Sequence, residues 1–167
     1  MSPAPALLLL AFLIPVPLPG RRPAPPRPDR AAWAQVLAGF QQRGVAVVNG
    51  HPRCAEPNLD GLYVRGRREV VVCARGEPST TLRHEGWHLV QSLCLNDQPW
   101  LTAEQIERLL SRDDRRELQA LVAPERRHQE AEARVMARQP PAAYLQAMDR
   151  ACVGRLPFDP QPSTRQI

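Results

Sequence analysis

The chain has 167 residues, of which 43% are apolar, so it can bury one modest core but has no room for two sizeable ones. Its formal charge is +5, and the first thirty residues hold four arginines and one aspartate, which leaves the remainder nearly balanced. All 22 basic residues are arginine, charges of both signs are mixed along the chain, and there is no nucleic-acid recognition motif or aromatic platform. We therefore expect one catalytic or binding domain and no nucleic-acid partner.

Residues 1–20 form a hydrophobic, signal-like segment, which is almost wholly apolar over positions 4–18. The segment is too short and too rich in proline for a comfortable membrane span. A linker rich in proline and arginine follows over residues 21–29. This arrangement predicts export to the periplasm or the exterior, either with cleavage around positions 20–24 or with the uncleaved segment as a loose membrane anchor.

The folded domain is expected over residues 30–153, followed by an irregular, proline-containing tail over 154–167. A helix with an apolar stripe begins at Asp29 or Arg30 and ends at Gly44. Short β-branched or apolar runs then predict strands at 45–48, 62–64 and 69–74. Because strands this short need helices to cover them, we expect a mostly helical α+β domain with a small antiparallel sheet.

The segment 78–95 is predicted to be one helix and contains the HExxH sequence His84-Glu85-Gly86-Trp87-His88. Residues four apart lie about 40° apart around a helix, so the two histidines can face one ion. Thr81 and Gln91 share the side of the histidines, and apolar residues occupy the opposite side, which gives the helix a back for the core and a polar front. The pattern predicts His84 and His88 as metal ligands and Glu85 as a general base beside them.

Four cysteines are present, an even number without a CxxC pair, which favours two disulfides and agrees with export. Three pairings are open. We favour Cys54 with Cys73, before the metal helix, and Cys94 with Cys152, which would tie the end of that helix to the last helix. The alternative is four reduced, buried thiols in a cytosolic protein.

The remaining chain is predicted to be helical. Thr102 and Gln105 have the spacing of a capping box and start a helix that ends near position 111. Further helices are expected at 113–122, 125–138 and 140–152.

A catalytic zinc ion normally has three protein ligands, so a third must accompany the two histidines. The candidates on the 125–138 helix are Glu130, Glu132 and His128. Glu130 and Glu132 lie about 200° apart around a helix, so only one can face the metal. The helical pattern alone does not decide between them.

The strand, the HExxH helix and a downstream Glu130-x-x-Ala133 helix together resemble the gluzincin metallopeptidases. The resemblance covers about 70 residues, and it implies a zincin-like fold, with Glu130 as the third zinc ligand and Ala133 and Ala137 as small residues that let the two helices approach. It also implies that the strand over 69–73 holds an extended substrate. The chain departs from this family at Arg134, where an acid usually orients the first histidine. It is also similar to small uncharacterised exported proteins of cyanobacteria.

The resemblance and the motif together predict an exported peptidase that binds one zinc ion and acts on a peptide or protein substrate. Zinc lowers the pKa of its water, and Glu85 takes the proton as that water attacks a peptide carbonyl. The alternative is a non-catalytic zincin-like protein in which the metal is structural or absent, which the arginine at position 134 and the small size favour.

Overall fold

The structure is a computed structural model that describes residues 30–158. The signal-like segment 1–20, the linker 21–29 and most of the tail therefore lie outside the described residues. Within that range the chain forms six α-helices, three strands and two short 3₁₀ helices. In chain order they are α1 (Arg30–Gln42), β1 (Ala46–Asn49), η1 (Pro52–Ala55), β2 (Gly61–Tyr63), β3 (Glu69–Val72), α2 (Pro78–Leu93), α3 (Ala103–Leu109), α4 (Arg112–Leu121), η2 (Pro124–Arg126), α5 (Arg127–Ala137) and α6 (Pro141–Ala151).

The sheet has the strand order β1-β3-β2 and is mixed, so the expected antiparallel sheet is wrong for one of its two pairings. β2 and β3 are antiparallel and are joined through a turn at Arg65–Gly66, whereas β1 runs parallel to β3. The end of β1 and the start of β2 both pair with Val72, so the connection over residues 50–60 crosses the end of β3. β3 is therefore central, and its Val70, Val71 and Val72 are buried.

Both favoured disulfides are present. Cys54 lies in the connection that crosses the end of β3 and is bonded to Cys73, which directly follows that strand. Cys94 at the end of α2 is bonded to Cys152 at the end of α6. The two bridges are compatible with an exported protein. In residues 30–158 no helix is both long enough and apolar enough to span a membrane.

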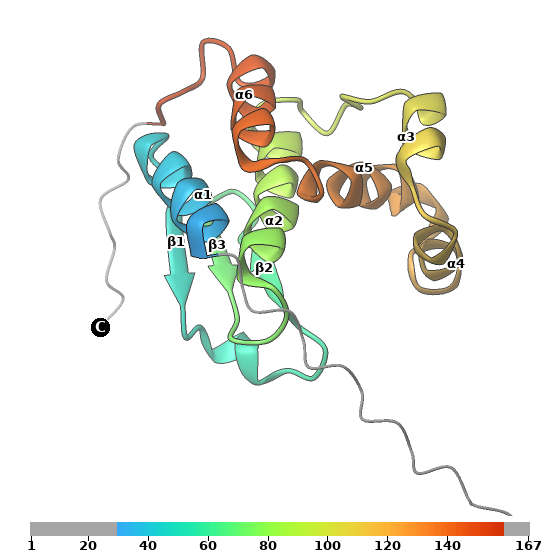
Figure 1. Ribbon diagram of the computed structural model, residues 1–167, viewed down its shortest axis with the longest axis horizontal. Helices are drawn as coiled ribbons and strands as arrows, with labels where there is room; N and C mark the ends of the chain where they lie inside the picture. Colours follow the sequence, from blue (N-terminus) through green and yellow to red (C-terminus); the bar gives the residue numbers. More distant parts are fainter. Residues whose placement is uncertain (1–29, 159–167) are drawn as a thin grey trace, which may run out of the picture.

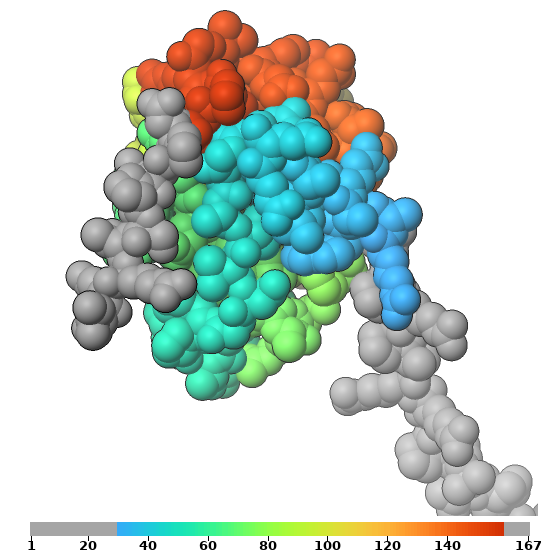
Figure 2. All heavy atoms as spheres, turned by 90° about the vertical axis from the view of Figure 1, so that its left-hand side faces the viewer, coloured from blue at the N-terminus to red at the C-terminus, as the bar shows by residue number. Residues whose placement is uncertain are grey.

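Helix α2 lies in the middle of the molecule, with the sheet and α1 on one side and α5 on the other; α6 packs on α1 and α2, and α3 and α4 pack on α5 (Figure 1). Figure 2 shows the face where residues of α1 and of the segment after it, in blue and cyan, fill the middle below the red residues near the end of the described chain. The main core lies between these layers, around α2. Its largest fully buried side chains include Phe40, Leu82, Trp87, Leu89, Tyr144 and Met148.

Local signals fix the helix starts close to their predicted positions. The carboxylate of Glu77 accepts hydrogen bonds from the backbone of Ser79 and Thr80 and so caps α2. The predicted capping box of Thr102 and Gln105 is confirmed at the start of α3. A second box, between Ser111 and Asp114, starts α4.

Candidate metal centre

Helix α2 carries the HExxH residues, and its position is set by its apolar back. Gly86 lies so close to α1 that a Cβ atom built on it would be 2.1 Å from Cζ of Phe40 and 2.9 Å from the hydroxyl oxygen of Tyr144. A larger residue would push the helices apart. The glycine inside the motif therefore allows close packing behind α2, while the opposite side, with His84 and His88, faces α5.

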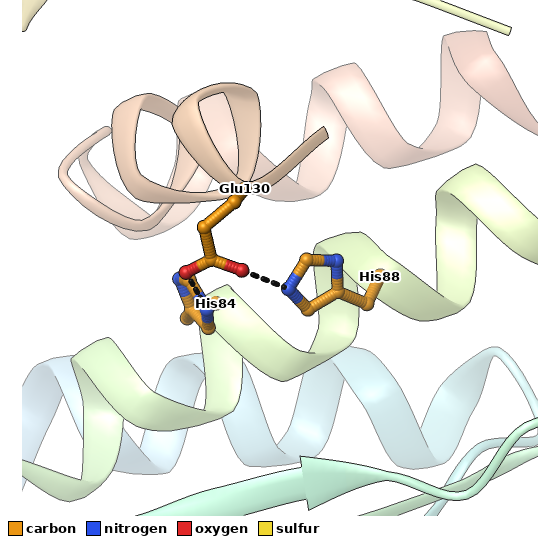
Figure 3. Close-up of side chains that lie close together, drawn as sticks. All are labelled: His84, His88 and Glu130. Carbon is orange, nitrogen blue, oxygen red and sulfur yellow. Dashed lines mark ion pairs between the residues drawn. The ribbon is translucent and has the colours of Figure 1, made fainter. Parts of the chain in front are cut away.

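The structure brings His84, His88 and Glu130 together between α2 and α5 (Figure 3). The Nε2 atom of His84 lies 3.2 Å from Glu130 Oε1, and Nε2 of His88 lies 3.3 Å from Glu130 Oε2. One ligand atom from each residue lies within 4.8 Å of the other two. Ligand atoms of a tetrahedral zinc site are separated by about 3.3 Å, and two imidazoles with one carboxylate are a known catalytic donor set. The three residues could thus hold a metal ion.

The three side chains are each about four-fifths buried, and the hydrogen bonds between them change the pKa values of Glu130 and His88. Burial opposes ionisation of Glu130, but its hydrogen bonds with His84 and His88 hold the pKa of its carboxyl well below the ordinary value. Burial likewise disfavours the charged form of His88, yet the hydrogen bond to Glu130 and the charge of Glu85 raise its pKa. Protons and a metal ion would therefore compete for the same nitrogen atoms.

Glu85 lies beside these ligands and is fixed by the sheet. Its Oε2 accepts a hydrogen bond of 2.9 Å from the backbone N–H of Tyr63 in β2. Gly61, two residues earlier, lets β2 approach α2, because a Cβ there would be 2.6 Å from Thr81 Cγ2 and 3.1 Å from Glu85 Cγ. The carboxylate is thus positioned on the polar front without belonging to the three-residue ligand group.

Glu132, the rival for the third ligand, points away from the histidines. It is fully buried, and its two oxygens accept four hydrogen bonds of 2.7–3.0 Å from Trp87, Gln91, Trp100 and Leu101. Its role in this structure is to join α5 to α2 and to the loop before α3.

Arg134 stands where the resemblance leads us to expect an acid that orients His84. Its Nη1 lies 2.8 Å from a carboxylate oxygen of Glu117 and 3.6 Å from one of Asp114, and its Nε lies 3.5 Å from Glu130 Oε1. Within residues 30–158 the Nδ1 atom of His84 has no hydrogen-bond partner. The arginine therefore contacts the ligand carboxylate and not the histidine.

The other candidate histidine is not at the centre. The Nε2 atom of His128 lies 3.1 Å from the carbonyl oxygen of Leu101. The helical pattern of the sequence places Gln91 on the same face of α2 as the histidines but indicates no role for it. Its Oε1 lies 2.8 Å from Nδ1 of His88, and the signal for this contact was the spacing of three residues on one helix.

Two cavities of about 420 and 640 Å³ lie beside the centre, and both are lined by His84, Glu85 and Glu130. Residues of β2 line both cavities as well. β2 is an edge strand, whereas β3, expected to hold a substrate, is paired along both sides. An extended chain could therefore pair with β2 but not with β3.

The chain matches no family model, no curated protein and no solved structure.

Proposed function

We propose that the protein is a small exported metallopeptidase, of the gluzincin type, that binds one zinc ion. The observation that carries the proposal is the convergence of His84, His88 and Glu130, with Glu85 and two cavities beside them. Histidine nitrogens with one carboxylate oxygen favour zinc over magnesium or calcium, which prefer oxygen ligands alone.

Each residue has a defined task in this proposal. His84, His88 and Glu130 would hold the ion, which supplies a Lewis acid and lowers the pKa of bound water. Glu85 accepts the proton of the attacking water and later returns it to the leaving amine. The outer edge of β2 is the surface along which an extended peptide would lie. The hydrogen bond from Tyr63 to one oxygen of Glu85 leaves the other oxygen for the proton.

The test separates metal binding from cleavage. The purified protein is analysed for zinc without chelator, and cleavage is followed with a library of internally quenched peptides. Glu85→Gln should keep the zinc and lose cleavage, because the amide cannot accept the proton. Glu104→Gln, an exposed change on α3, is the matched control. Loss of zinc from Glu85→Gln, or unchanged cleavage, would contradict the assigned role.

A second candidate is a non-catalytic protein with the same fold. The observation that favours it is the contact between Arg134 and Glu130, together with the lack of a described partner for His84 Nδ1. A histidine ligand without such a partner is held less firmly. Zinc bound at one equivalent with no cleavage in the peptide library would select this candidate, and absence of zinc would remove the metallopeptidase proposal.

A further inference from the structure

Gln91 contacts the metal centre from one turn further along α2, and its side chain has a single possible orientation. It is 3% exposed. Its amide nitrogen donates to the backbone carbonyl of Gln129 and to Glu132 Oε1, both at 3.0 Å. Rotating the carboxamide by 180° would place its oxygen against these two acceptors, so the oxygen must face His88.

This orientation decides which nitrogen of His88 carries the hydrogen. Gln91 Oε1 can only accept, so the Nδ1 atom 2.8 Å away must be the donor. The Nε2 atom of the neutral ring then has a free electron pair, and this is the atom that lies 3.3 Å from Glu130. Gln91 thus presents His88 in the tautomer that a metal ion requires.

Glu132 is what holds Gln91 in place. Each of its oxygens accepts two hydrogen bonds, one pair from Trp87 and Gln91 and the other from the backbone of Trp100 and Leu101. The side chain is fully buried, and with four donors both oxygens are satisfied as acceptors. Glu132 therefore fixes the amide nitrogen of Gln91 on the side away from His88.

We infer that Gln91 is a positioning residue for His88 and that the buried carboxylate of Glu132 is its anchor. The chain runs from carboxylate to carboxamide to imidazole, and it both orients the ring and makes Nε2 a better electron donor. Glu132, the alternative ligand from the sequence, then serves the centre from a distance, with no contact to the ion. This inference rests on the proposed metal centre and goes beyond it by assigning two residues outside the ligand set.

The experiment measures zinc affinity by competition with a chromophoric chelator in the unmodified protein, in Gln91→Met and in Val90→Ala. Methionine keeps the volume of glutamine and removes the acceptor, so we expect zinc binding about 10- to 100-fold weaker. Val90 is a fully buried neighbour on α2, and its truncation should lower the melting temperature with unchanged zinc affinity. The visible spectrum of the cobalt-substituted protein should change in Gln91→Met and stay the same in Val90→Ala.

A double variant tests the link to Glu132. If Glu132 acts through Gln91, Gln91→Met combined with Glu132→Gln should bind zinc as weakly as Gln91→Met alone, because the two changes break one chain. If the zinc affinity of the double variant instead falls by the product of the losses in the two single variants, the anchor role is overturned. Unchanged zinc affinity and cobalt spectrum in Gln91→Met, with zinc bound by the unmodified protein, would overturn the positioning role while the metal centre stands. Failure of the unmodified protein to bind zinc would overturn both.

Discussion

Arg134 follows Glu130 by one turn of α5, and its Nε atom lies 3.5 Å from Glu130 Oε1. The guanidinium is held there by Glu117, and burial, which opposes its charge, is outweighed by the carboxylates that raise its pKa. A fixed positive charge therefore lies next to the carboxylate that would bind the ion. It attracts negative charge away from the ion and repels the ion itself.

The first prediction follows from this contact. Arg134→Gln should bind zinc about tenfold more tightly, because one positive charge near a divalent ion is removed in a partly buried site. Chelator competition at two salt concentrations measures the change, and the gain should shrink at the higher salt concentration. Arg108→Gln makes the same charge change at an exposed position on α3 and should leave the affinity unaltered. Equal zinc binding in Arg134→Gln would show that the guanidinium does not oppose the ion, and weaker binding would show that it supports Glu130.

The local part of the site could be predicted from the sequence. A spacing of four on one helix is enough to place His84 beside His88, and the apolar back of the helix decides which way they face. The same periodicity placed Gln91 on that face. Its function could not be predicted, because the contact with His88 depends on a side-chain orientation that Glu132 and Gln129 impose from another helix.

The non-local part could not be predicted in the same way. The crossing angle between α5 and α2 decides which glutamate of α5 faces the histidines, and this angle cannot be derived from the residue pattern of a single helix. The parallel pairing of β1 with β3 was missed because it depends on the path of residues 50–60, which cross the end of β3 and are fixed there by the Cys54–Cys73 disulfide. The ambiguity over the third ligand and the error over the sheet both concern contacts between segments that are distant in the sequence.

The second prediction concerns the approach of β2 to Glu85. Gly61→Ala would place a methyl group 2.7 Å from the carbonyl oxygen of Val71 and 3.1 Å from Glu85 Cγ, so β2 must move away from α2. Because the backbone N–H of Tyr63 holds Glu85, we expect peptide cleavage to fall about 10- to 100-fold while zinc affinity stays within about threefold.

The control for this variant is Gly39→Ala, whose methyl group would lie 2.5 Å from Leu145 Cδ1, between α1 and α6 and away from β2. It should cost about 1 to 3 kcal/mol of unfolding free energy in urea, as a crowded core substitution does, without a specific loss of cleavage. If Gly61→Ala and Gly39→Ala both lose cleavage in proportion to their loss of unfolding free energy, then β2 does not act by fixing the position of Glu85.

The third prediction is a pH dependence of stability that originates at Asp114, near the start of α4. Its carboxylate accepts hydrogen bonds from Arg138 and from the backbone and hydroxyl of Ser111. The Arg138 guanidinium, helped by Ser111 and opposed by burial, holds the pKa of Asp114 well below its usual value near 3.8. Between the two pKa values the unfolded chain binds more protons, so this contribution is complete above about pH 5 and is lost as the pH falls below about 4.

Asp114→Asn should therefore lower the unfolding free energy at pH 7 by about 1 to 3 kcal/mol, because a charged acceptor with three donors becomes neutral. The loss should narrow at lower pH, since the parent protein gives up the same interaction there. Urea unfolding from pH 7 to pH 2 measures both curves. Asp113→Asn removes the same charge from the same turn of α4, where the side chain is 87% exposed, and should run parallel to the parent curve. A constant difference between the Asp114→Asn and parent curves at all pH values would mean that the side chain stabilises the fold through packing, and that its ionisation contributes nothing.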